Sequence, residues 1–130
     1  MAILLVQLGT DRLPGEGVRI GTVRRPPRGV PKAEYARRNY YDVWLPDLSP
    51  SAKVIAEYQT SKGADKAWNR LERRYRAEMK APEKARLPGL LAALSHTTNF
   101  SVGCYCEDER RCHRSILKNL LRSHGAALGP

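Results

Sequence analysis

The sequence predicts an α/β fold: a single compact domain in which a mostly parallel sheet of about four strands is covered by about four helices. The 130 residues suffice for one compact core and are too few for two ordinary ones. Apolar runs of strand length alternate with segments of helical periodicity, and strands separated by helices usually form parallel sheets. The apolar share of 42% and the charged share of 28% are typical of a globular chain. We therefore expect residues 1–130 to form one domain.

Three strands are expected in the N-terminal part. Ile3–Leu8 is an apolar run that ends at Gly9, which is typical of a strand covered on both faces. Val18–Val23 alternates apolar residues with Arg, Gly and Thr, which is a weaker strand pattern. Tyr40–Leu45 is rich in aromatic and β-branched residues and stops at Pro46, so it is the third expected strand.

Three segments in the middle of the chain have helical patterns. A helix should begin at Ser49-Pro50, an N-cap followed by proline, and continue to about Gln59. Pro82–Leu94 is also helical, and Pro88-Gly89 within it implies a kink or two short pieces. The helix between these two, which Asp65 can cap, is the clearest, because its apolar residues recur at spacings of three and four. They are Trp68, Leu71, Tyr75 and Met79.

The C-terminal part predicts one more strand and one more helix. Phe100–Cys106 has the composition of a short strand, and Cys112–Ser123 has an apolar helical face with Gly125 available to end it. Ligands of parallel sheets bind beyond the carboxyl ends of the strands. The turn between this strand and this helix is therefore where a functional site is expected.

The net charge of +10 is concentrated in two blocks. Arg19–Arg38 contains seven basic residues and one acid, and Lys66–Lys80 contains six and two. Within the first block, Arg24–Lys32 has two consecutive prolines and a glycine, so it is expected to be an exposed loop. Such clusters favour a polyanionic partner, because each neutralised phosphate releases counterions. The competing interpretation is the highly charged surface of a heat-tolerant protein.

The expected compartment is the cytoplasm. The apolar opening Met1–Leu8 is short and has no basic stretch before it, so we interpret it as a buried strand and not as a signal peptide. No run approaches the roughly 20 apolar residues that cross a bilayer, so no membrane partner is expected. The three cysteines lie within nine positions, which is no disulfide framework.

The turn Cys104–Arg114 concentrates the residues that can do chemistry. It contains all three cysteines, three acids, three arginines and one of the three histidines. Strand periodicity places Cys104 and Cys106 on one face. Cys112 stands at the start of the last helix, where the positive end of the helix dipole favours a thiolate or a bound anion. Cys112 is therefore the best candidate for a thiolate.

The turn into the last helix also carries the motif Cys-x-Glu…Cys-His-Arg before an apolar helix. Its residues are Cys106, Glu107, Cys112, His113 and Arg114. This ending is similar to the signature of the domain of unknown function 488 (DUF488) family. Further segments resemble the YeaO-like branch of the family in the same order: Pro27-Arg28-Gly29-Val30 with Lys32, Trp44-Leu45, Ser49-Pro50-Ser51 and Arg73–Met79. The resemblance covers residues 18–125 and implies a compact α/β fold, and it supplies site positions without a reaction.

The leading hypothesis is a domain that binds a phosphate-bearing ligand, a nucleotide or a nucleic acid, at the carboxyl edge of the sheet. Arg28, Arg114 and Lys32 are the expected phosphate-binding residues, because guanidinium and ammonium groups pair strongly with phosphate oxygens. Glu107 and His113 would position the rest of the ligand. This hypothesis expects Glu107 and Arg114 to converge in one pocket that Arg28 approaches from its loop.

A second hypothesis is an enzyme that uses the same pocket. Cys112 would be a nucleophile activated by the helix start and by His113 or Arg114, with Glu107 as acid or base. Cys104 and Arg110 also have the Cys-x5-Arg spacing of tyrosine phosphatases. The acids between them and the lack of glycine argue against such a phosphate-binding loop.

A third hypothesis is an interaction module, either stabilised by zinc or purely structural and without a cofactor. The zinc ligands would be Cys104, Cys106, Cys112 and His113. No paired Cys-x-x-Cys is present to strengthen the case for zinc. In a purely structural module, the first two cysteines are core residues, and Arg114 pairs with Glu107 or Asp108 to fix the turn.

The remaining aromatic and histidine side chains are expected outside any site. Tyr40, Tyr41 and Trp44 belong to an expected strand, where aromatic residues are more often part of the core than base-stacking surfaces. His96 and His124 lie near helix ends and are expected at the surface.

Overall fold

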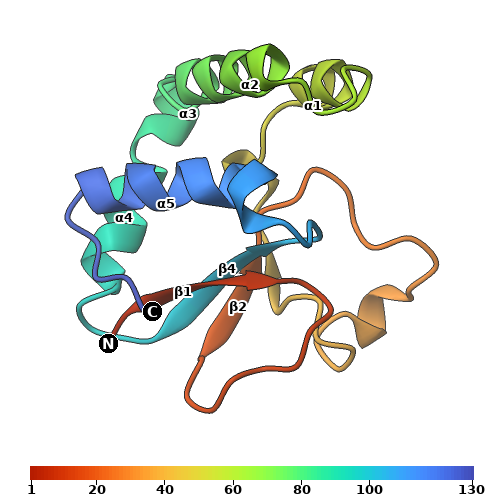
Figure 1. Ribbon diagram of the computed structural model, residues 1–130. Coiled ribbons are helices and arrows are strands. Elements are labelled where there is room, and N and C mark those ends of the chain that lie inside the picture. The colour runs from red at the N-terminus through yellow and green to blue at the C-terminus, as the bar shows by residue number, and fades with distance from the viewer.

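The structure, a computed structural model, describes all 130 residues and confirms the α/β fold (Figure 1). One all-parallel sheet has the strand order β1-β4-β2-β3. The strands are β1 (Ile3–Gln7), β2 (Val18–Gly21), β3 (Val43–Trp44) and β4 (Phe100–Cys104). The helices are α1 (Ala52–Gln59), α2 (Asp65–Glu78), α3 (Pro82–Ala85), α4 (Leu87–Leu94) and α5 (His113–Ser123). Short 3-10 turns are η1 (Lys32–Glu34), η2 (Pro46–Leu48) and η3 (Glu109–Arg111).

Each expected strand and helix is present, with differences at the ends. The segment with Pro88-Gly89 forms two pieces, α3 and α4, which the sequence allowed. α1 is capped by Ser51 and not by Ser49, because the Ser51 hydroxyl accepts a hydrogen bond from the backbone N–H of Val54 at 3.3 Å. Ala64 occupies the cap position of α2, so Asp65 lies in the first turn, near the positive end of the helix dipole.

The main core lies between the sheet and the helices on one of its faces. α5 lies against the sheet, and α2 packs against α5 on the side away from the sheet (Figure 1). One buried cluster joins Ile3 and Val102 of the sheet to Leu117 and Leu121 of α5 and to Tyr75 of α2. None of the helices combines the length and apolar composition that crossing a membrane requires.

The opposite face of the sheet contains a buried ion pair that the sequence did not predict. Nε of Arg19 donates to Oε2 of Glu16 at 2.8 Å, and the two side chains are 0% and 1% exposed. Arg19 also donates to the carbonyl oxygens of Thr10 and Asn39, and Glu16 accepts from the Ser101 hydroxyl. The pair thus ties two loops to β2 and β4, and Arg19 contributes nothing to the basic surface.

Candidate functional site

A cavity of about 500 Å³ opens at the carboxyl ends of β2 and β4, the edge at which ligands of parallel sheets bind. Its walls come from the loop after β2, from α1 and α2, and from the turn that leads into α5. The lining residues used below are Arg25, Arg28, Tyr58, Trp68, Cys104, Cys106, Arg111, Cys112 and His113.

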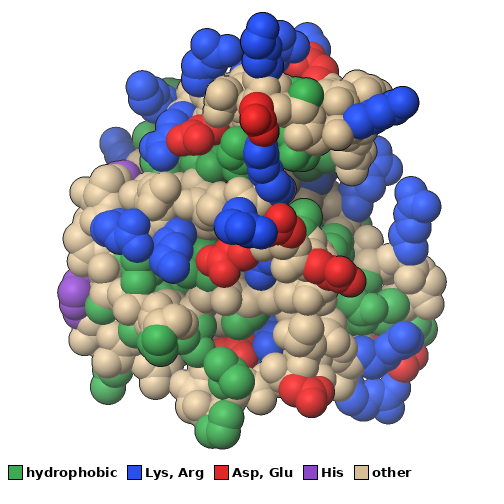
Figure 2. Space-filling model, in the orientation of Figure 1, with side chains coloured by type: hydrophobic (Ala, Val, Ile, Leu, Met, Phe, Trp, Pro, Cys, Tyr) green, Lys and Arg blue, Asp and Glu red, His purple; other side chains and the backbone are tan.

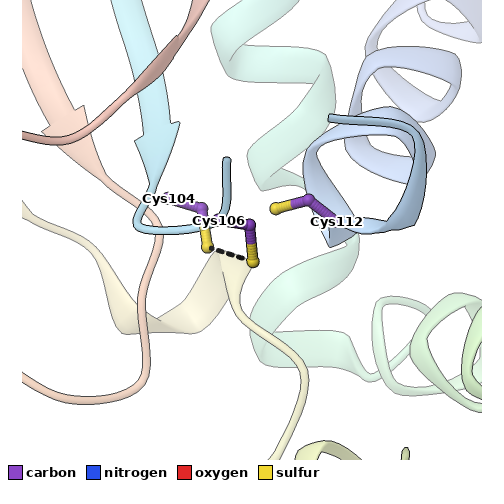
Figure 3. Close-up of side chains that lie close together, drawn as sticks. All are labelled: Cys104, Cys106 and Cys112. Atoms are coloured by element: carbon purple, nitrogen blue, oxygen red, sulfur yellow. Dashed lines mark hydrogen bonds between the residues drawn. The ribbon is translucent and has the colours of Figure 1, made fainter. Parts of the chain in front are cut away.

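All three cysteines line this cavity, and their sulfurs lie close together (Figure 3). The Sγ atoms of Cys104 and Cys106 are 3.7 Å apart, and all three Sγ atoms lie within 4.8 Å of one another. Cys104 is the last residue of β4, Cys106 follows in the turn, and Cys112 immediately precedes α5. All three are free thiols, of which only Cys106 is exposed. The strand, the turn and the helix start therefore build the cluster together.

The contacts among the three sulfurs change the pKa values of the thiols, and these values indicate which sulfur carries a negative charge. Hydrogen bonds from Cys104 and Cys106 lower the pKa of Cys112, and His113 lowers it further. Hydrogen bonds to Cys106 and Cys112, together with burial, raise the pKa of Cys104. For Cys106 the hydrogen bond with Cys104 lowers the pKa, but the bond to Cys112 and burial outweigh it, so this pKa is raised. A single negative charge in the cluster therefore belongs on Cys112.

His113 stands beside Cys112 with one nitrogen already engaged. Its Nε2 donates to the backbone carbonyl oxygen of Thr22 at 2.7 Å, and its ring packs edge-to-face against Tyr75. Because a carbonyl oxygen only accepts hydrogen bonds, Nε2 carries a proton, and Nδ1 is the nitrogen left to interact with Cys112. Nδ1 lies 4.0 Å from Sγ of Cys112. The end of β2 thus orients a potential base toward the cysteine.

Arg114 and Glu107 do not form the arrangement that the sequence suggested. Arg114 is buried, does not line the cavity, and donates through Nη2 to the carbonyl oxygen of Cys106 at 2.6 Å. It makes no ion pair with Glu107 or Asp108, and Asp108 pairs with Arg110 instead. Glu107 is exposed on the outside of the turn, with no hydrogen bond to its side chain. Arg114 fixes the turn, but through a backbone carbonyl.

The loop after β2 brings guanidinium groups to the cavity. Arg28 lines it, as the sequence expected of this loop, and Arg25 does so as well. Both are exposed, and neither belongs to any of the ion pairs of the molecule. The Tyr105 hydroxyl donates to the carbonyl oxygen of Arg25 at 2.9 Å, and Arg24 donates to two backbone carbonyls before α1, so the loop is held in place. Lys32 lies in η1, exposed and outside the lining.

An aromatic wall also lines the cavity. Trp68, which the sequence assigned to the core stripe of α2, is half-buried and lines the cavity with Tyr58 of α1 at a ring distance of 5.5 Å. The guanidinium of Arg111 lies 5.7 Å from the Trp68 ring and pairs with Asp65. No sequence pattern indicates this wall, because it depends on how α1 and α2 dock.

The second basic block is separate from the cavity. Figure 2 shows Lys and Arg side chains gathered along α2 at the top of the view. They lie around a shallow hollow on the outer face of this helix that includes Lys66, Arg70 and Arg73, whereas Trp68 on the inner face lines the cavity.

The aromatic and histidine side chains outside the cavity have mixed positions. Tyr41 is buried and Tyr40 half-buried, but Trp44 is 42% exposed and anchored through its indole N–H to a backbone carbonyl. The expectation of a core position is therefore wrong for Trp44, because β3 is a two-residue edge strand. His96 and His124 are exposed, as expected.

Comparison with known protein families gives one match. The family model DUF488-N3a, described as the active DUF488-N3 subclade, matches residues 3–125. This range includes every strand of the sheet and all five helices. Neither a curated protein nor a solved structure matches the chain significantly.

Proposed function

The chain belongs to the DUF488 family, in the subclade described as active, and from this premise we propose that its cavity binds a phosphate-bearing ligand of nucleotide size. The observation that carries the proposal is a pair of exposed guanidinium groups, Arg25 and Arg28, that line the cavity without a carboxylate partner. Within the family we propose the YeaO-like branch, on the motif Pro27-Arg28-Gly29-Val30, combined with the ending Cys112-His113-Arg114 that resembles the signature of the wider family.

The two arginines suit phosphate because each presents a planar fork of N–H donors that matches two phosphate oxygens. Their positive charge is not neutralised by the protein, so it is available to an incoming anion. Lys32, which follows this loop in η1, adds to the positive charge of this part of the molecule. Arg114 supports the site from below by holding the carbonyl oxygen of Cys106.

The aromatic wall favours a nucleotide over inorganic phosphate. A cavity of about 500 Å³ is in the usual range for small-molecule sites and is too small for a folded polynucleotide. Trp68 and Tyr58 offer ring faces and edges on which a nucleobase can pack within the same cavity as the arginines. His113 also lines the cavity and would contact the ligand there.

Calorimetric titration tests this proposal with inorganic phosphate, a panel of mononucleotides and short single-stranded oligonucleotides as separate probes. We expect mononucleotides to bind more tightly than phosphate. The double substitution Arg25→Gln with Arg28→Gln should weaken binding by about tenfold or more per arginine, since hydrogen bonds to charged groups contribute about 1.5–3 kcal/mol each.

The matched control is Arg38→Gln with Arg86→Gln, which removes the same charge from exposed positions outside the cavity lining. It should leave binding nearly unchanged, apart from a small, salt-sensitive effect. If no probe binds the wild-type chain, or if both double variants bind alike, the proposed site is wrong. Binding of oligonucleotides alone would replace a nucleotide ligand with a nucleic acid.

A second candidate function is thiol chemistry, favoured by the contact between Cys112 and Nδ1 of His113. Glu107 is the remaining acid or base on this turn, although it lies outside the cavity. The chemistry requires reduced thiols, so we propose the cytoplasm as the compartment.

Alkylation by iodoacetamide at one fixed pH, with a chelator present and sites read by mass spectrometry, tests the thiol candidate. Cys112 should react faster than Cys104, and His113→Gln should slow it by a factor on the order of 100, the usual size of a base effect. Glu107→Gln separates the role of that carboxylate. Equal rates for all three thiols, or no effect of His113→Gln, would remove this candidate.

A further inference from the structure

The spacing of the three cysteine sulfurs resembles that of the ligands of one metal ion (Figure 3). A zinc–sulfur bond is about 2.3 Å long, so two sulfurs on a tetrahedral ion are about 3.8 Å apart. The Cys104 and Cys106 sulfurs are 3.7 Å apart, and no pair in the cluster exceeds 4.8 Å. We propose that Cys104, Cys106 and Cys112 bind a thiophilic metal ion such as zinc, independently of the phosphate ligand proposed above.

The fold holds two of these ligands rigidly and leaves one adjustable. Cys104 is fixed by the pairing of β4 with β1, and Cys112 is fixed at the start of α5. Cys106 is exposed in the turn, where Arg114 holds its backbone carbonyl. Two rigid sulfurs and one on a turn can close around an ion through small side-chain rotations. Such an arrangement reduces the conformational entropy that metal binding costs.

A nearby positive charge can offset the negative charge of a metal ion bound by three thiolates. A divalent ion on three thiolates leaves one net negative charge, which needs a nearby cation. The guanidinium of Arg114 is buried beside Cys106, and its Nε has no partner in the protein. Arg114 therefore stabilises a negatively charged cluster in a place where an isolated buried arginine would otherwise be costly.

The cluster supplies three ligands and leaves a fourth position for another group. His113 is oriented by the carbonyl oxygen of Thr22, which is the outer-shell contact usual for metal-binding histidines. Its Nδ1 is 4.0 Å from Sγ of Cys112, so this nitrogen, water or a ligand atom from the cavity can take the position. Three protein ligands with one open position are typical of catalytic, and not of structural, zinc sites.

Metal titration of the reduced, chelator-treated full chain tests the proposal. Zinc should bind at one ion per chain in competition with a chromophoric chelator. Cobalt, used as a coloured substitute, should give the sulfur-to-metal charge-transfer absorption of a thiolate site. Cys106→Ser should weaken zinc binding by a factor on the order of 100, and it should leave the fold intact because Cys106 is exposed. Zinc should also protect Cys112 from alkylation.

The double substitution His96→Ala with His124→Ala is the control, because it removes the two exposed histidines and leaves the cluster unchanged. Zinc binding should persist in this variant. Binding that survives in Cys106→Ser, that disappears with the surface histidines, or that gives cobalt no sulfur band would overturn the proposal. Because none of these measurements includes a nucleotide, they fail or succeed separately from the test of the phosphate site.

Discussion

Glu16→Gln should destabilise the domain by about 3–5 kcal/mol, because it leaves a buried guanidinium without its counter-charge. The carboxylate of Glu16 accepts two hydrogen bonds from Arg19, at 2.8 and 3.0 Å, and a third from Ser101 at 2.6 Å. A neutral amide of the same shape cannot compensate the charge of the Arg19 guanidinium. Its NH₂ group would also face the N–H groups of Arg19, and two donors cannot form a hydrogen bond with each other. The free energy of unfolding in urea, with its midpoint and slope, measures the effect.

A matched control is available in the same chain. Glu34 and Arg37 also form an ion pair three residues apart, but their side chains are 30% and 74% exposed. Exposed pairs contribute about 0–1 kcal/mol, so Glu34→Gln should change the free energy of unfolding by no more than that. Equal, small losses in both variants would mean that water solvates the Glu16 site and that the pair is not buried.

The same pair predicts a pH dependence. Burial acts to raise the pKa of Glu16, but hydrogen bonds from Arg19, Ser101 and the backbone N–H of Leu13 outweigh it and lower the pKa from 4.5 to about 2. A lowered pKa means that this stabilisation is complete above about pH 4.5 and is lost as the pH falls toward 2. Glu16→Gln should therefore remove part of the acid dependence of unfolding in this window.

The buried pair marks a limit of what the sequence could predict. Periodicity located the strands and helices, because each pattern is local and each element buries one face. Arg19 lies in a segment with seven basic residues and one acid, where charged residues are expected at the surface. Only the packing of two loops over β2 and β4 makes that position an interior one.

At the candidate site, too, some features could be predicted from the sequence and others required the structure. The sequence identified the turn from Cys104 to Arg114, because the residues of the cluster are close in the chain. It could not show that Glu107 points outward while Arg114 is buried, since both depend on the conformation of a turn. Likewise the sequence predicted the basic loop, but it could not show that Arg25, Arg28 and Trp68 line one cavity, because this depends on how three segments dock.

The proposals of metal binding and of thiol chemistry both involve the sulfur of Cys112. A metal ion on its sulfur would withdraw the thiolate from reaction, so zinc loading and alkylation compete for one atom. The proposed phosphate ligand would bind Arg25 and Arg28, which belong to the loop after β2 and not to the cysteine cluster. Nucleotide binding can therefore be measured in metal-loaded and metal-free protein, and a difference would show that the open coordination position contacts the ligand.

Gly17→Ala should destabilise the domain by about 2–6 kcal/mol. About 1–3 kcal/mol of this comes from forcing alanine into a positive φ, and about 1–3 kcal/mol comes from overpacking. Gly17 has φ +79°, and a Cβ at this position would stand 2.0 Å from the backbone carbonyl oxygen of Asn99. That oxygen belongs to the backbone directly before β4, so no flexible side chain can move aside. Unfolding in urea gives the size of the effect.

Gly15→Ala separates the two causes of this loss. Gly15 has a similar φ of +73°, but its Cβ would meet no atom within 4 Å, so this variant should show only the smaller, conformational cost.

The contact at Gly17 also sets the pairing of β2 with β4, which starts at Val18 opposite Phe100. This pairing ends just before Thr22, the residue that orients His113. Gly17→Ala should therefore also slow alkylation of Cys112 in the folded protein, whereas Gly15→Ala should not. Equal stability of the two variants would contradict the close approach of the two strands.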